Sequence, residues 1–212
     1  MTLRRTAQAA QTAHALTAAL AILGILLHLV IVFGHPGEIG WRLVRLFSFF
    51  TILTNLLVAV AAAGLALPRG RLHDWAARPA SRAAVTLHIL VVALIFHALL
   101  RNMVQPGLLG WWGNMLVHQL APAAWTTCWL AFPAHGGIDR AAPLRWLIYP
   151  LLFAGWTLLH GAPSGWYPYP FMDVAQLGYP AVLRNLALIG LVFLALGYAL
   201  RWLDGRLDAR TM

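Results

Sequence analysis

Long apolar runs separated by short arginine-bearing connectors constrain this chain more than any other feature. Crossing the hydrocarbon core of a membrane takes roughly 20 predominantly apolar residues. Because 61% of the chain is hydrophobic and only 10% is charged, it lies outside the soluble globular class. We expect an all-α polytopic membrane protein, a single domain over residues 1–212 with six spans. The segments that meet or approach this length lie at about 13–33, 46–67, 83–100, 112–132, 145–160 and 181–203.

The distribution of arginine predicts how the chain is oriented. All 15 basic residues are arginine and the net charge is +9, and arginine accumulates in cytoplasmic loops. An orientation with both termini inside leaves only four arginines outside, so the charge indicates topology and not a nucleic-acid surface. The composition suits a bacterial inner membrane. The outer arginines are Arg42, Arg45, Arg101 and Arg184, and the inner ones are Arg4, Arg5, Arg69, Arg71, Arg78, Arg82, Arg140, Arg145, Arg201, Arg206 and Arg210.

Polar side chains recur at one depth, in the outer half of five predicted spans. An ionisable group in hydrocarbon is costly and marks a functional site by default. For a single histidine, a hydrogen bond to a neighbouring helix is an equally good explanation, but convergence from five helices favours a site. Asn114 and His118 are four residues apart and share one helix face. The other members are His28, Ser48, Thr51, Thr54, Asn55, His97 and His160.

The second predicted span carries a hydroxyl that can serve as a nucleophile. Ser48, Thr51 and Asn55 fall at i, i+3 and i+7 and form one stripe on a helix, with Thr54 beside it. A threonine hydroxyl is a weak nucleophile and needs a base within hydrogen-bond reach. Thr51 and His118 match in depth. The alternative is that the hydroxyl bonds a carbonyl of its own helix, the usual fate of threonine in a span.

The segment 161–180 between the last two spans has no basic residue and is rich in aromatic residues and proline. Its prolines oppose a continuous helix, so we expect a lid or re-entrant cap over the outer mouth. An ordinary interfacial belt of aromatic side chains is the alternative. Asp173 is its only acid, and beside the histidines it would orient a ring or tune its pKa. Whether it reaches His118 or His160 is open at this stage.

Several standard kinds of site are missing from the sequence. There is no CxxC, HExxH, P-loop or GxSxG motif, and the single Cys128 excludes an intrachain disulfide. Zinc bound by histidines with Asp173, or haem between His28 and His118, is an alternative. Because the histidines sit singly on different helices without a short ligand pair, we expect no metal and no cofactor.

Three stretches taken together, FSFFTILTNLLVAV, GWWGNMLVH and GWYPYPFMD, resemble the androgen-induced, FAR-17a-type family of six-span membrane proteins, including its bacterial branch. Animal members are threonine hydrolases that cleave fatty acid esters of hydroxy fatty acids. The resemblance implies Thr51 as nucleophile, His118 as general base, and an acyl-threonine intermediate. It also aligns Asn114 with the family's Asn-x-x-x-His pattern. The chain departs from the pattern at Asp173, where animal members tend to have glutamate, and Thr54 is a rival nucleophile.

The sequence therefore predicts an intramembrane hydrolase of lipid esters. Thr51 and His118 form its catalytic pair, and the supporting residues are Asn114, Asn55, His160 and Asp173. The expected partner is a membrane lipid as substrate, and no nucleic acid. A lipid- or quinone-binding membrane protein without catalytic activity is the alternative from a different class.

Overall fold

The computed structural model describes residues 2–103, 107–132 and 135–209, with side chains from residue 5 onward. Arg4 and Arg210, two of the arginines assigned to the inner side, lie outside the described side chains. Every regular element in these ranges is a helix. Four helical segments are long and apolar enough to cross a membrane, and a fifth is added if the bent pair α2 (Ile39–Phe47) and α3 (Phe50–Ala66) counts as one. The four are α1 (Thr2–Gly34), α5 (Pro79–Ile95) with η1 (Phe96–Leu100), α8 (Ala142–Trp146) with α9 (Ile148–Ser164), and α10 (Val174–Asp208).

The segment predicted as the fourth span is built from three successive pieces. These are α6 (Leu108–Met115), the π-helical turn η2 (Leu116–Leu120) and α7 (Ala121–Ala131), which follow one another without a break. None of the three is long enough to cross a membrane alone. The predicted range 112–132 therefore coincides with helical structure, and only the three pieces together reach the length of a span.

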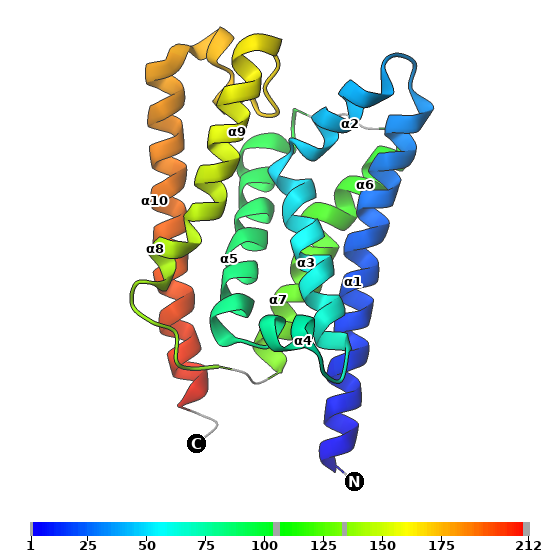
Figure 1. Ribbon diagram of the computed structural model, residues 1–212, viewed down its shortest axis with the longest axis vertical. Coiled ribbons are helices and arrows are strands. Elements are labelled where there is room, and N and C mark those ends of the chain that lie inside the picture. Colours follow the sequence, from blue (N-terminus) through cyan, green and yellow to red (C-terminus); the bar gives the residue numbers. More distant parts are fainter. Residues whose placement is uncertain (1, 104–106, 133–134, 210–212) are drawn as a thin grey trace.

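The helices lie roughly side by side, with α3, α5 and α7 in the middle, α1 on one side and α9 and α10 on the other (Figure 1). The first turn of α1, the last turn of α10 and the short helix α4 (Arg71–Ala76) gather at one end of the molecule, the terminal end. Helix α2 and the α9–α10 connection lie at the opposite end, which we call the α2 end.

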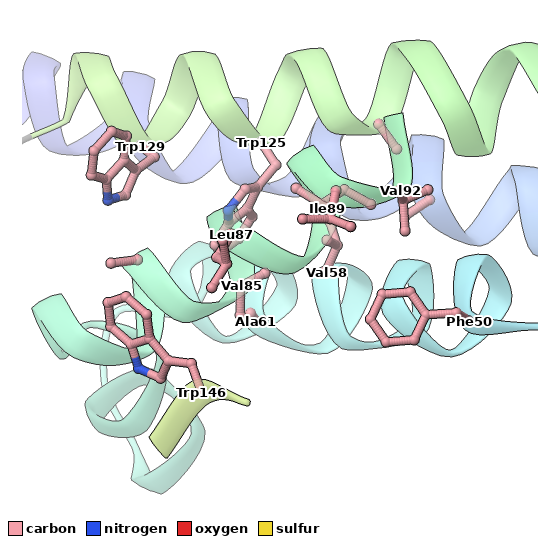
Figure 2. Packing of buried hydrophobic residues seen from close by; sticks show 14 of the residues in the cluster. Phe50, Val58, Ala61, Val85, Leu87, Ile89, Val92, Trp125, Trp129 and Trp146 are labelled. Atoms are coloured by element: carbon pink, nitrogen blue, oxygen red, sulfur yellow. The ribbon is translucent and has the colours of Figure 1, made fainter. Parts of the chain in front are cut away.

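Close packing around α7 and η2 fixes the helices that carry the site. Trp125 and Trp129 extend from α7 into the core (Figure 2), and Trp125 Nε1 donates to Thr86 Oγ1 of α5 at 2.9 Å. On the other side, a Cβ at Gly24 of α1 would lie 2.6 Å from Val117 Cγ1. Only glycine permits this approach, as is usual where membrane helices touch. Helix α1 and η2 are thereby held together at the level of His118.

The second predicted span, at about 46–67, is not one straight helix: it takes in the end of α2 and the whole of α3. The chain bends by 72° between α2 and α3. Ser48 Oγ donates to Val44 O at 2.7 Å, and the Ser48 and Phe49 N–H groups bond back to α2 and close its last turn. Ser48 therefore lies in the break, not on one stripe with Thr51 and Asn55. Thr51 is placed in the first turn of α3.

The predicted spans 13–33 and 181–203 fall inside the longer helices α1 and α10, and 83–100 falls inside α5 with η1, because helical structure continues past the apolar core into the polar ends. The predicted span 145–160 runs from α8 into α9, which Leu147 separates. The C-terminal helix α10 contains one kink, at Gly178, where φ is 74° and ψ is 158°. A residue with a side chain rarely adopts this left-handed φ. Since Pro180 follows two residues later and also opposes a regular helix, the first turn of α10 is set at an angle to its long apolar part.

Candidate functional site

His118 lies in the π-helical turn η2, and the local sequence explains why the helix widens there. The Ala121 N–H bonds to the carbonyl five residues earlier instead of four. Pro122 follows, has no N–H, and cannot continue the ladder to Val117 O. Asn55 Nδ2 of α3 donates to that free carbonyl at 3.0 Å. π-Helical turns inside helices are frequent at functional sites, and here the turn opens a place for a side chain from another helix.

Asn55 links the two halves of the site. Its Nδ2 also donates to Thr51 O at 2.9 Å, so one amide group holds both the carbonyl of Thr51 and that of Val117. The side chain is fully buried, and its Oδ1 has no partner among the described residues. Asn55 therefore supports the geometry of the Thr51 and His118 pair and does not touch the cavity.

The central contact joins Thr51 Oγ1 and His118 Nε2 at 3.3 Å, and both side chains are buried. His118 Nδ1 lies 3.1 Å from the backbone carbonyl of Asn114. A carbonyl can only accept a hydrogen bond, so Nδ1 carries the proton and donates. In the neutral ring Nε2 then holds the lone pair, and the Thr51 hydroxyl donates to it. This is the tautomer that a general base for Thr51 requires.

An aromatic ring holds the imidazole of His118 in place. Phe96 stacks on it with ring centroids 3.8 Å apart and planes 14° from parallel. Phe96 is the first residue of the second π-helical turn, η1, where the Arg101 N–H bonds to Phe96 O at 2.8 Å. Two π-helical turns from different helices therefore meet at the same imidazole.

Tyr169 completes the surroundings of Thr51. Its hydroxyl accepts from the Thr51 N–H at 3.4 Å, one of the backbone donors that the first turn of a helix leaves unpaired. Burial raises the pKa of the Tyr169 hydroxyl, so it stays protonated and can also donate. Its ring packs between Phe49 and Phe171. The segment between α9 and α10 thus packs over Thr51, which agrees with the predicted lid, and Tyr169 is buried instead of facing a membrane interface.

Two cavities meet at this point. The larger, about 360 Å³, contains Thr51, His118, His28 and Asn114 in its walls and lies under the lid. The smaller, about 70 Å³, extends between α5, α9 and α10, and apart from the hydroxyls of Thr51 and Tyr169 its walls are apolar. Thr51, Tyr169 and Leu100 line both cavities. The Thr51 hydroxyl therefore stands at the junction of a space with polar groups and an apolar one.

The histidines predicted at this level do not all converge. His28 lines the larger cavity, and the glycine at 113 makes room for its ring, since a Cβ there would lie 2.8 Å from His28 Cε1. His97 is exposed and bonds to a carbonyl of its own helix. His160 stacks on Trp156 and lines neither of these cavities. In the described parts of the chain, no group of three or more histidine, cysteine or acidic side chains is placed to hold a metal ion.

Two further predicted residues have structural contacts elsewhere. Thr54 Oγ1 lies 3.1 Å from the hydroxyl of Tyr149, away from both cavities and from His118. Asp173 caps α10, where its carboxylate accepts from the backbone N–H and the side-chain amide of Gln176. Asp173 thus acts as a helix cap, and the geometry gives it no ring to orient.

Sequence reasoning missed Tyr169 and Phe96. Tyr169 lies in the aromatic segment 161–180, where an interfacial position is the ordinary expectation, but the prolines on both sides of it restrict the backbone and could have marked it as a fixed residue. Phe96 carries no signal in the sequence, because its role depends on a contact between two helices. Pro122, four residues after His118, is the signal that could have indicated the widened turn.

The arrangement can support acyl transfer. It combines a hydroxyl, an imidazole in the tautomer of a base, and the donors of Thr51 and Tyr169 at one place. No protein-family model, no curated protein and no solved structure matches this chain.

Proposed function

We propose that this protein is an intramembrane threonine hydrolase that cleaves lipid esters through an acyl-threonine intermediate. The observation that carries the proposal is the 3.3 Å contact of Thr51 Oγ1 with His118 Nε2, in which the bond from Nδ1 to Asn114 O fixes the tautomer. The resemblance to the FAR-17a-type hydrolases gives Thr51 and His118 the same roles and supports the proposal independently of this distance.

The chemistry proceeds in two halves. His118 Nε2 takes the hydroxyl proton as Thr51 Oγ1 attacks the ester carbonyl, and the imidazolium then gives this proton to the departing alcohol. Negative charge on the carbonyl oxygen is stabilised by the Tyr169 hydroxyl, which the Thr51 N–H polarises by donating to its oxygen. Water, activated by His118 in the same way, then cleaves the acyl-threonine and releases the fatty acid.

The two cavities suit the two parts of such a substrate. The apolar cavity between α5, α9 and α10 takes the first carbons of the acyl chain, and the larger cavity under the lid takes the alcohol part. Both parts meet at Thr51, where the ester bond must lie. Fatty acid esters of hydroxy fatty acids, or similar esters, have this form.

The proposal includes six spans with both termini inside, in a bacterial inner membrane. For six spans, α2 and α3 must together cross the membrane once, and α6, η2 and α7 must together cross it once. An even number of crossings agrees with the position of both ends of the chain at the terminal end (Figure 1). Arg69, Arg71 and Arg78, near α4, make that end the cytoplasmic one. The site then lies in the outer half and is reached from the outer leaflet.

Hydrolysis by purified protein in detergent micelles tests the proposal. A fluorogenic long-chain fatty acid ester is incubated with the wild type and with Thr51→Ala, Thr51→Ser, His118→Ala and Thr54→Val. We expect turnover by the wild type and by Thr54→Val, a weaker activity in Thr51→Ser, and loss of at least about 10³-fold in the two alanine variants. Wild-type protein that binds the lipid but does not hydrolyse it would favour the lipid- or quinone-binding alternative.

A further inference from the structure

Two of the arginines assigned to the outer side lie one turn apart on α2, Arg42 and Arg45. They run against the bias of basic residues towards the cytoplasm, and α2 lies at the end remote from the termini (Figure 1). Arg42 has a structural use, because its guanidinium donates to Val32 O at 2.5 Å, to His35 O and to Gly37 O at 2.9 Å. It ties the α1–α2 connection in place.

Arg45 does not hold a backbone segment in place as Arg42 does. Among the described residues no hydrogen bond and no acidic partner is found for its guanidinium, and the side chain is exposed. Two aromatic rings hold the group in place, with its Cζ 5.4 Å from the centre of the Trp41 ring and 5.1 Å from that of the Trp166 ring. Cation–π contacts of this kind do not use the N–H groups of a guanidinium, which stay available to an anion. Arg45 is therefore a positioned cation without a counter-ion.

The space beside this cation adjoins the Thr51 site. A cavity of about 340 Å³ has Arg42 and Arg45 in its walls, together with Leu46 and Phe49. Leu46 and Phe49 also line the 360 Å³ cavity that contains Thr51 and His118. These two side chains are therefore the common wall of the two cavities, and Arg45 lies on the other side of it from the Thr51 site.

We infer that Arg45, with Arg42 beside it, binds an oxyanion on the alcohol part of the lipid substrate, a carboxylate or a phosphate. The inference rests on the proposed function and adds a specificity-determining residue to it, one that selects lipid esters with an anionic group several methylenes from the ester. A bidentate guanidinium contact suits either anion. The neutral form of the same ester lacks this contact and has to bind by its apolar chains alone.

Binding and turnover are measured separately, so that this inference and the proposed function can fail independently. Binding of oleate, its methyl ester and oleyl phosphate is followed by the fluorescence of the intrinsic tryptophans in neutral detergent micelles. The proteins are the wild type, Arg45→Gln, Arg45→Lys, and Arg184→Gln as a control at another outer arginine, which lines none of these cavities. We expect Arg45→Gln to weaken binding of an anionic ligand about tenfold or more, to leave the methyl ester unchanged, and to be partly rescued in Arg45→Lys.

Comparison of the ligands distinguishes the source of the anion, since preference for oleate indicates a carboxylate substrate and preference for oleyl phosphate a phosphate one. The hydrolysis assay is repeated with an ester of a hydroxy fatty acid and with its carboxylate methylated. Here KM for the acid rises in Arg45→Gln while kcat changes little. Equal losses with charged and neutral ligands, or no loss with either, would overturn the inference. If the wild type hydrolyses neither ester, the proposed function fails, and the binding series still decides whether Arg45 holds an anion.

Discussion

The hydrogen bond from Asn55 to Val117 O leads to a quantitative prediction, because Asn55 supplies the donor that Pro122 cannot give to this carbonyl. Pro122 removes the N–H that would otherwise bond to Val117 O, and Asn55 Nδ2 replaces it at 3.0 Å. In Asn55→Leu the buried carbonyl loses this donor, which costs about 1–3 kcal/mol of unfolding free energy. The same substitution removes the unpartnered Oδ1 and offsets part of the cost. The single variant therefore has a modest net effect on stability.

The double variant isolates the contact. Pro122→Ala restores an N–H to the helix, and in either an α or a π ladder a backbone donor becomes available for Val117 O. Asn55→Leu should then be less costly in the Pro122→Ala background than in the wild type, with a coupling energy of about 1–2 kcal/mol. Both Asn55→Leu and Pro122→Ala should lower ester turnover, since each disturbs the distance between Thr51 and His118.

Unfolding in mixed micelles, followed by tryptophan fluorescence, gives the four free energies of the cycle. Thr126→Val, on the same helix as Pro122, serves as the matched control and should show no coupling to Asn55→Leu. Additive effects of Asn55→Leu and Pro122→Ala, within about 0.5 kcal/mol, would refute the reasoning that links the proline, the π-helical turn and the amide.

Three other substitutions test separate parts of the site. Tyr169→Phe keeps the ring contacts and removes one donor to the developing oxyanion, so kcat should fall about 10²-fold with little change in thermal stability, measured by turnover and by a fluorescence melt. Ala154→Phe fills the apolar cavity of about 70 Å³, so kcat/KM should fall for long-chain esters and not for short-chain ones in a chain-length series. Asp173→Ala removes the cap of α10 and should cost about 0.5–2 kcal/mol of unfolding free energy while the folded protein keeps its turnover; a large loss of kcat would assign Asp173 to the chemistry.

The sequence was sufficient to predict an all-helical chain with membrane-spanning segments, because long apolar runs have few other solutions. It also pointed to the residues that meet at the centre, since Thr51, Asn55, Asn114 and His118 all fall at one depth. Depth follows from position along a span, and position can be counted along the chain. The tautomer of the neutral His118 ring could not be predicted in this way, because it depends on which carbonyl His118 Nδ1 reaches.

The features that the sequence did not predict correctly depend on the direction in which a side chain points, and not on its depth in the membrane. His160 was expected at the level of His118, but its ring stacks on Trp156 of its own helix and lines neither cavity. Ser48 and Thr51 were expected on one face, and the 72° bend separates them. The cap made by Asp173 depends on where α10 begins, which an apolar pattern does not locate to the residue. Such features require the packing of several helices at once.

Covalent labelling tests the central claim most directly. Purified protein is treated with a fluorophosphonate probe, and the modified peptide is mapped by mass in the wild type and in Thr51→Ala, Thr54→Ala and His118→Ala. The proposal predicts a probe adduct on Thr51 that disappears in the Thr51 and His118 variants and persists in Thr54→Ala. Absence of an adduct, or an adduct elsewhere that all three variants retain, would contradict a nucleophilic threonine with a histidine base.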